Sequence, residues 1–134
     1  MLVVDSSAIL EAFATVDPPA RLLERLATDA SLHAPHLIDT EVLSVLRRMT
    51  IHETIGAERA ELARADFDDL GLIRYPHQPL SSRVWELRHN LSAYDATFVA
   101  LAEALSAPLV TCDRRLASAT GHRAEVELFA VARA

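Results

Sequence analysis

The chain has 134 residues and a formal net charge of −6 at pH 7. This length fits one domain with a buried core, and a hydrophobic content of 51% argues against disorder. The acidic balance argues against a broad, nonspecific nucleic-acid binder, and the single cysteine, Cys112, excludes an internal disulfide or a cysteine-based zinc site. The sequence contains no lysine, which excludes a P-loop lysine, a Schiff-base lysine and a lysine general base.

Nothing at the N-terminus has the pattern of a targeting signal. It lacks the basic start of a secretory signal, and Asp5 interrupts its short apolar run. No apolar run in the chain approaches the ~20 residues of a membrane span. We therefore expect a cytoplasmic protein with no membrane association.

Short apolar runs alternate along the chain with stretches of helical period. The expected strands are 2–4, 31–35, 72–76, 108–112 and 126–131. The expected helices are 6–13, 18–29, 37–49, 56–70, 79–89 and 93–105, the second started by two prolines and the fourth closed by Gly71. This alternation predicts an α/β fold over residues 1–134: a single domain with a central, mostly parallel sheet between two layers of helices.

Two of the expected strands stop at an aspartate. "LVVDSSA" reaches Asp5 after the first strand, and "APLVTCD" reaches Asp113 after a late one. In parallel sheets the site lies beyond the carboxyl ends of the strands. Asp5 and Asp113 are therefore expected on the same rim of the sheet.

Two further acids occupy unusual helical positions. Asp95 lies in the first turn of "YDATFVALAEAL", on the line of the apolar stripe, where a capping role beside Ser92 is the alternative explanation. Glu41 borders the buried face of the helix that starts near Leu37, and its position near a helix N-terminus is by itself a sufficient reason for an acid there. Asp39 is the better candidate for the cap of that helix.

Taken together, these four acids predict a metal site. First turns of helices that follow strands lie on the same rim as the strand ends, so Asp5, Glu41, Asp95 and Asp113 are expected to converge. Four carboxylates cannot lie close together ionised without a counter-charge, and oxygen ligands suit Mg²⁺ or Mn²⁺. The hydroxyls of Ser6 and Thr111 are expected to support this site, although ordinary capping or strand polarity also accounts for them.

At these residues the sequence resembles the PIN-domain family, and within it the VapC-type toxins of bacterial toxin–antitoxin pairs. The matching stretches are "VVDSSAILEAF", "LIDTEVLSVLRR" and "LSAYDATFVALAEALSAPLVTCDRRLASA". The resemblance implies a three-layer α/β/α sandwich, Mg²⁺- or Mn²⁺-dependent endoribonuclease activity, inhibition by a cognate antitoxin, and a homodimer. Carried over by position, the catalytic and metal-binding acids are Asp5, Glu41, Asp95 and Asp113.

The residues that follow Asp113 depart from the family pattern. Many PIN domains have a further acid shortly after the last one, but here Asp113 is followed by Arg114 and Arg115. These arginines are candidate contacts for RNA phosphates, and a solvated helix start explains them equally well. The alternative function is a PIN-like RNA- or protein-binding module with little catalysis. A dehalogenase-type phosphatase is excluded because the sequence lacks its lysine and has Ser7 in place of its second aspartate.

Overall fold

A computed structural model describes residues 1–28 and 31–131 and contains one five-stranded sheet. All neighbouring strands are parallel, in the order β3-β2-β1-β4-β5, which confirms the predicted parallel sheet. The strands are β1 (Leu2–Val4), β2 (Leu32–Pro35), β3 (Ile73–Tyr75), β4 (Leu109–Thr111) and β5 (Val126–Leu128). β1, β2 and β4 are buried throughout, as expected for inner strands covered on both faces.

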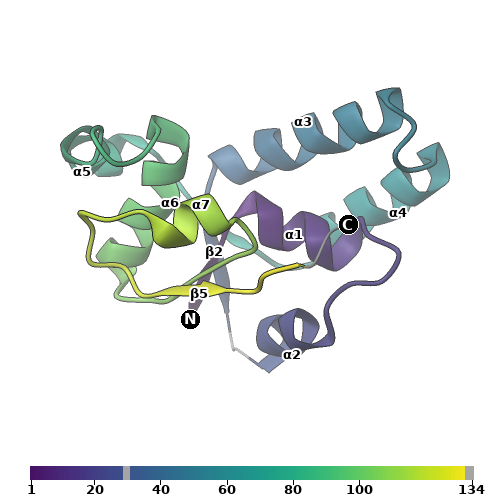
Figure 1. Cartoon of the computed structure of the whole chain (residues 1–134), viewed down its shortest axis with the longest axis horizontal. Coiled ribbons are helices and arrows are strands. Elements are labelled where there is room, and N and C mark those ends of the chain that lie inside the picture. The colour runs from purple at the N-terminus through teal and green to yellow at the C-terminus, as the bar shows by residue number, and fades with distance from the viewer. Residues whose placement is uncertain (29–30, 132–134) are drawn as a thin grey trace.

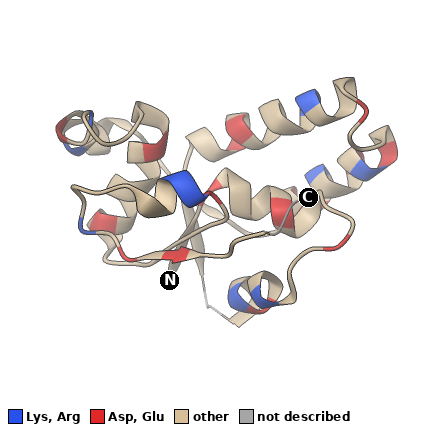
Figure 2. Cartoon of the chain, in the orientation of Figure 1, with Lys and Arg blue, Asp and Glu red and all other residues tan. Residues whose placement is uncertain are grey.

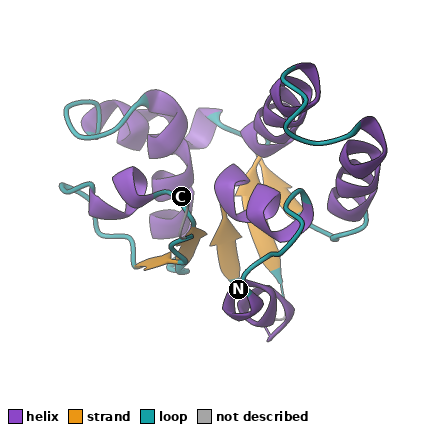
Figure 3. Ribbon diagram, turned by 45° about the vertical axis from the view of Figure 1, so that its right-hand side comes forward, coloured by secondary structure: helices purple, strands orange, loops and turns teal. Residues whose placement is uncertain are grey.

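The strands are connected by helices in two groups. The helices are α1 (Ser6–Phe13), α2 (Ala20–Thr28), α3 (Leu37–Ile51), α4 (Ala57–Asp68), the short 3₁₀ helix η1 (Gln78–Leu80), α5 (Ser81–Glu86), α6 (Ala93–Leu105) and α7 (Arg114–Ser118). In Figure 1, α5, α6 and α7 gather on the left of the view and α1, α3 and α4 on the right; Figure 3 shows the same two groups with the sheet between them. The predicted three-layer arrangement is thus confirmed.

The order of the strands places a topological switch between β1 and β4. The chain runs outward from β1 through β2 to β3, then returns to the other side of β1 and continues from β4 to β5. Because parallel crossovers are right-handed, the outward path puts α1 to α4 on one face and the return path puts α5 to α7 on the other. The loops after β1 and β4 therefore diverge, and they open a crevice at the carboxyl ends of these two strands.

Helix α6 anchors the return layer. Its residues from Ala96 to Ala102 are all buried, and it packs against β1, β2 and β4. Ser92 caps its N-terminus by accepting a hydrogen bond from the Asp95 amide at 3.1 Å, as the sequence suggested. No helix in the described part of the chain is long and apolar enough to cross a membrane.

Several boundaries differ from the expected ones. The helix expected over 79–89 is η1 followed by α5, which ends at Glu86, and the last strand ends at Leu128 instead of residue 131. Helix α4 ends at Asp68, before Gly71, whose φ of +71° places it in the left-handed region. Helix α2 begins only after both prolines, and Asp29, its expected last residue, lies outside the described residues.

Candidate active site

Asp5 follows β1 and caps helix α1. Its Oδ1 accepts hydrogen bonds from the Ala8 amide at 3.0 Å and from the Ser7 hydroxyl at 2.7 Å, and its Oδ2 accepts one from the Thr111 hydroxyl at 2.5 Å. The residue is only 7% exposed. Burial raises the pKa of Asp5 although these hydrogen bonds oppose the shift, and the nearby charge of Asp113 raises it further.

The strand register explains why Thr111 reaches Asp5. Val4 pairs with Val110, so the next residue of each strand lies at the same level of the sheet. Thr111 Oγ1 also accepts a hydrogen bond from the Asp113 amide at 3.0 Å. Thr111 therefore holds the side chain of one site acid and the backbone of another, which gives this predicted supporting residue a defined structural position.

Ser7 is a supporting residue that the sequence reasoning missed. Besides donating to Asp5, its hydroxyl oxygen accepts a hydrogen bond from the Cys112 amide at 2.9 Å and lies 3.2 Å from Thr111 Oγ1. It thus ties the first turn of α1 to the end of β4. The pair of serines after Asp5 was a signal, but only the orientation of the first helical turn decides which serine faces β4.

Glu41 lies in the early part of α3 and is partly buried. The hydroxyl of Ser6 donates to its Oε1 at 3.0 Å, so Ser6 supports Glu41, whereas Ser7 supports Asp5. Burial raises the pKa of Glu41, and the charges of Asp95 and Asp5 raise it further. The carboxylates of Asp5 after β1 and Asp95 on α6 thus both influence Glu41 on α3.

Asp95 and Asp113 share a contact with Arg115. Arg115 Nη2 lies 3.3 Å from Asp95 Oδ2 and 3.8 Å from Asp113 Oδ2. Burial raises the pKa of Asp95 and the charge of Asp113 adds to the increase, while Arg115 partly opposes it. Asp113 also caps α7, since its Oδ1 accepts from the backbone amides of Arg115 at 2.9 Å and Leu116 at 3.4 Å.

The structure therefore brings the four predicted acids to one rim, at the switch between β1 and β4. The charge of Asp113 raises the pKa values of Asp5 and Asp95, and the charges of Asp5 and Asp95 raise the pKa of Glu41. Capping accounts for two of these residues individually, but it does not explain why three of them are held with raised pKa values beside one another. Such a cluster of perturbed carboxylates is typical of a functional site.

The donor set fits a hard divalent cation by its chemistry, because it consists of carboxylate oxygens flanked by hydroxyls. In the present side-chain conformations, however, no three acidic, histidine or cysteine side chains of the described residues are arranged to hold a metal ion. Asp5 faces Ser7 and Thr111, while Asp95 and Asp113 both lie beside Arg115. A cation held between Asp95 and Asp113 would displace Arg115.

The predicted cap of α3 is wrong. Asp39 does not cap the helix; it accepts two hydrogen bonds from Arg74 of β3, from Nε at 2.6 Å and from Nη2 at 2.8 Å. The helix starts at Leu37, whose amide donates to His77 Nε2 at 2.9 Å. A side chain from beyond β3 thus supplies the acceptor that the sequence assigned to Asp39.

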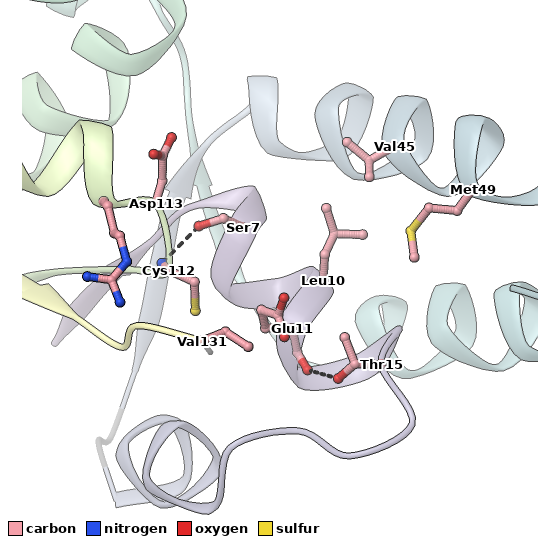
Figure 4. Close-up of a pocket in the computed structure, with 10 residues that line it drawn as sticks. Ser7, Leu10, Glu11, Thr15, Val45, Met49, Cys112, Asp113 and Val131 are labelled. Carbon is pink, nitrogen blue, oxygen red and sulfur yellow. Dashed lines mark hydrogen bonds between the residues drawn. The ribbon is translucent and has the colours of Figure 1, made fainter. Parts of the chain in front are cut away.

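Three cavities border the acids. One, of about 430 Å³, lies beside Glu41 and is also lined by Ser6, Thr40 and Arg48. Of the other two, the larger, of about 760 Å³, lies between α1, α3 and the segment after β4, and Ser7, Asp113 and Arg114 line its end nearest the site. Figure 4 shows Leu10, Val45 and Met49 facing one another across it from α1 and α3. A smaller cavity of about 350 Å³ borders Asp95 and Arg115. Figure 2 shows that basic residues at the start of α7 adjoin acidic positions near the strand ends.

Comparison with known proteins decides the family. Residues 2–121 match the PIN domain. The chain belongs to the PIN-domain family. Among PIN domains it groups with the VapC proteins: it is 47% identical to ribonuclease VapC9 of Mycobacterium tuberculosis over 116 residues, covering 87% of this chain and 88% of that one. It is 44% identical to ribonuclease VapC1 of the same species over 130 residues, covering 94% and 96%.

A solved structure agrees on the fold of this PIN domain. The crystal structure of M. tuberculosis VapC20, described as a sarcin-ricin loop cleaving toxin, matches with a TM-score of 0.64 at 19% identity, covering 88% of this chain and 94% of that one. At this identity the likeness supports the arrangement of sheet and helices alone. The resemblance inferred from the three sequence stretches is confirmed at the level of the family.

Proposed function

We propose that this PIN domain is a Mg²⁺- or Mn²⁺-dependent endoribonuclease that acts as the toxin of a toxin–antitoxin pair. The observation that carries the proposal is the convergence of Asp5, Glu41, Asp95 and Asp113 at the switch between β1 and β4, with raised pKa values on three of them. The names of the VapC relatives, which are ribonucleases, support the choice of RNA as the substrate.

Each acid has a role that its surroundings favour. Asp5, Asp95 and Asp113 would hold the metal ion, which when bound supplies Lewis acidity for the attack on the phosphate. Asp5 is fixed by Thr111 and Ser7, so it forms the rigid part of the ligand set. Glu41, with its raised pKa, suits a base that positions the attacking water and accepts its proton. Arg114, exposed at the start of α7, would contact the RNA backbone.

A cleavage assay on purified protein tests this function. Single-stranded RNA is incubated with the protein in Mg²⁺, in Mn²⁺ and in EDTA, with an Asp5→Asn preparation purified in parallel to exclude a contaminating nuclease. The proposal expects internal cleavage with either metal, and none in EDTA or with the variant. RNA binding without cleavage in any metal would instead support a binding module.

We place the inhibitory arm of an antitoxin in the larger cavity. Its wall of Leu10, Val45 and Met49 is apolar, and its far end reaches Ser7 and Asp113. A helix or extended segment lying there would bury apolar surface and cover the acids in one contact. A Val45→Asp substitution in this wall is expected to weaken inhibition by the antitoxin without abolishing RNA cleavage.

We also propose a homodimer, as the resemblance implies, and a cytoplasmic location, as expected from the sequence. Exposed apolar side chains such as Leu43, Ile51 and Leu62 on α3 and α4 offer a surface for a second copy. Light scattering of the purified protein measures the assembly directly.

A further inference from the structure

The smaller cavity beside Asp95 has a distinct composition. Residues 88–92, in the connection from α5 to α6, line it together with Asp95 and Arg115. It shares no lining residue with the larger apolar cavity. Two of its side chains are arginines and only one is an acid, in a chain whose net charge is −6. It is therefore a locally basic hollow that opens directly onto the acidic rim.

Arg88 is the cation that gives this hollow its charge. Its Nη1 donates to the backbone oxygen of Trp85 at 2.9 Å, and its Cζ lies 4.5 Å from the centre of the Trp85 ring. Within the described residues it has no carboxylate partner. Arg83, on the preceding helix α5, differs: it is paired with Glu103 at 2.7 Å and Glu86 at 3.0 Å. The charge of Arg83 is thus neutralised, whereas that of Arg88 is held in place and uncompensated.

Trp85 adds an aromatic surface to the same region. The residue is 67% exposed, and no other large apolar side chain of α5 is exposed with it. An exposed indole beside an arginine is typical of proteins that bind single-stranded nucleic acid, where bases stack on aromatic rings and arginines bind the backbone. Asn90 and Ser92, from the lining of the cavity, provide neutral polar groups next to this pair.

We propose that this hollow is an RNA subsite: Arg88 binds the phosphate adjacent to the cleaved one, and Trp85 stacks with a neighbouring base. The inference rests on the proposed function and specifies the path that the RNA strand takes to the acids. The strand enters or leaves the acidic rim past Asp95, on the side of α5 and α6. A phosphate fits this side because, of the three cavities at the acids, it is the one lined by more arginines than acids. The larger cavity has an apolar wall and contains Glu11 and Asp113 beside one arginine, and the cavity beside Glu41 contains one arginine and one acid.

Steady-state cleavage kinetics test this subsite. Arg88→Met removes one phosphate contact that is present before and during the reaction, so KM should rise several-fold while kcat stays unchanged. The salt dependence is a second readout: the slope of log kcat/KM against log salt concentration should become shallower by about 0.7, the value expected for one phosphate contact on a single strand. Arg47→Met on α3 removes the same charge at a residue that lines none of the three cavities, and it should leave KM and the slope as in the wild type.

A modified substrate tests the pairing itself. RNA in which single phosphates near the cleaved bond are replaced by neutral methylphosphonates should lose kcat/KM with the wild type at one position. At that position Arg88→Met should show no further loss, because the contact is already absent. Trp85→Ala should raise KM on every RNA tested, since stacking depends little on base identity.

The outcomes separate the subsite from the proposed function. Absence of metal-dependent cleavage by the wild type overturns the proposed function and the subsite with it. Normal cleavage combined with identical KM and salt slopes for Arg88→Met and Arg47→Met overturns the subsite alone. A change of oligomeric state in Trp85→Ala or Arg88→Met, with RNA kinetics unchanged, also overturns it and assigns the surface to a contact between two copies.

Discussion

The guanidinium of Arg115 donates a hydrogen bond to the carboxylate of Asp95, with Nη2 3.3 Å from Oδ2. The same nitrogen lies 3.8 Å from Asp113 Oδ2. In a chain without lysine, this arginine supplies the counter-charge that two adjacent acids need in the absence of a metal. Its side chain is 81% exposed, so the pair is easily broken. Exposed ion pairs contribute roughly 0.2–1 kcal/mol.

Arg115→Met should therefore increase the affinity for metal. A divalent cation that binds Asp95 and Asp113 must displace Arg115, and removing this competitor should lower the Kd for Mn²⁺ by about two- to five-fold. Isothermal titration calorimetry measures the Kd. Arg114→Met is the matched control, because it removes the neighbouring charge without touching either acid. Equal Kd values for the two variants would show that only the local charge matters.

The three site acids with raised pKa values should make the metal-free protein less stable as pH rises. The pKa values of Asp5, Glu41 and Asp95 are all raised by burial, so the folded chain binds protons that the unfolded chain releases. Stability then falls as pH rises from the unfolded pKa values of about 4 through the raised folded ones, and the loss is complete above them.

Asp95→Asn isolates one of these acids. The variant should unfold at a higher temperature than the wild type at neutral pH in EDTA, and the gap should close as the pH falls below the raised pKa of Asp95. Thermal melts of both proteins at several pH values measure this. A gap that stays constant with pH would mean that the variant acts through something other than the charge of Asp95.

Thr111→Val should loosen Asp5. The valine keeps the volume of a fully buried residue but removes the hydroxyl that donates to the Asp5 carboxylate. Hydrogen bonds to charged groups contribute about 1.5–3 kcal/mol, so the free energy of unfolding should fall by that amount, and the pKa of Asp5 should rise further. Urea unfolding measures the first effect. Thr111→Ser retains the hydroxyl and should recover most of the loss; equal losses in both variants would assign the effect to packing.

Asp39 and Glu41 should respond in opposite ways. Asp39→Asn weakens the ion pair with Arg74, which has two hydrogen bonds. Because both side chains are partly exposed, the free energy of unfolding should fall by about 1 kcal/mol, and RNA cleavage should not change. Glu41→Gln should reduce cleavage strongly and leave the fold intact or stabilised. The pair is a matched comparison of two acids on one helix. Loss of cleavage in Asp39→Asn with full activity in Glu41→Gln would reverse the assignment of the site acid.

The strand ends were predictable because local chemistry determines them. Runs such as Leu2–Val4 are too short and β-branched for helices, so Asp5 and Asp113 could be placed at strand ends without tertiary information. Asp95 was recognised because a charged residue interrupts an apolar stripe. These features predicted the fold class and three of the four acids, whereas Glu41 was included because the first turns of such helices lie on the same rim as the strand ends.

The remaining features depend on contacts between distant segments. The local sequence predicts Asp39 as a cap because it carries no information on Arg74 and His77, which lie more than 30 residues away along the chain. The division of roles between Ser6 and Ser7 depends on the orientation of one helical turn. The contact of Arg115 with Asp95 depends on how α7 lies beside α6. In each case a contact between segments far apart in the sequence, and not the local sequence, determines the position of the side chain.

RNA cleavage and metal binding by Asp95→Asn test the four-carboxylate site most directly. This substitution keeps the size of the side chain and the backbone N–H that donates to the Ser92 hydroxyl, but it removes one anionic oxygen from the proposed ligand set. We predict a folded variant, at least as stable as the wild type without metal, that binds Mn²⁺ more weakly and no longer cleaves RNA. Full cleavage by purified Asp95→Asn, with wild-type affinity for Mn²⁺ and no activity in a parallel Asp5→Asn preparation, would contradict the four-carboxylate site.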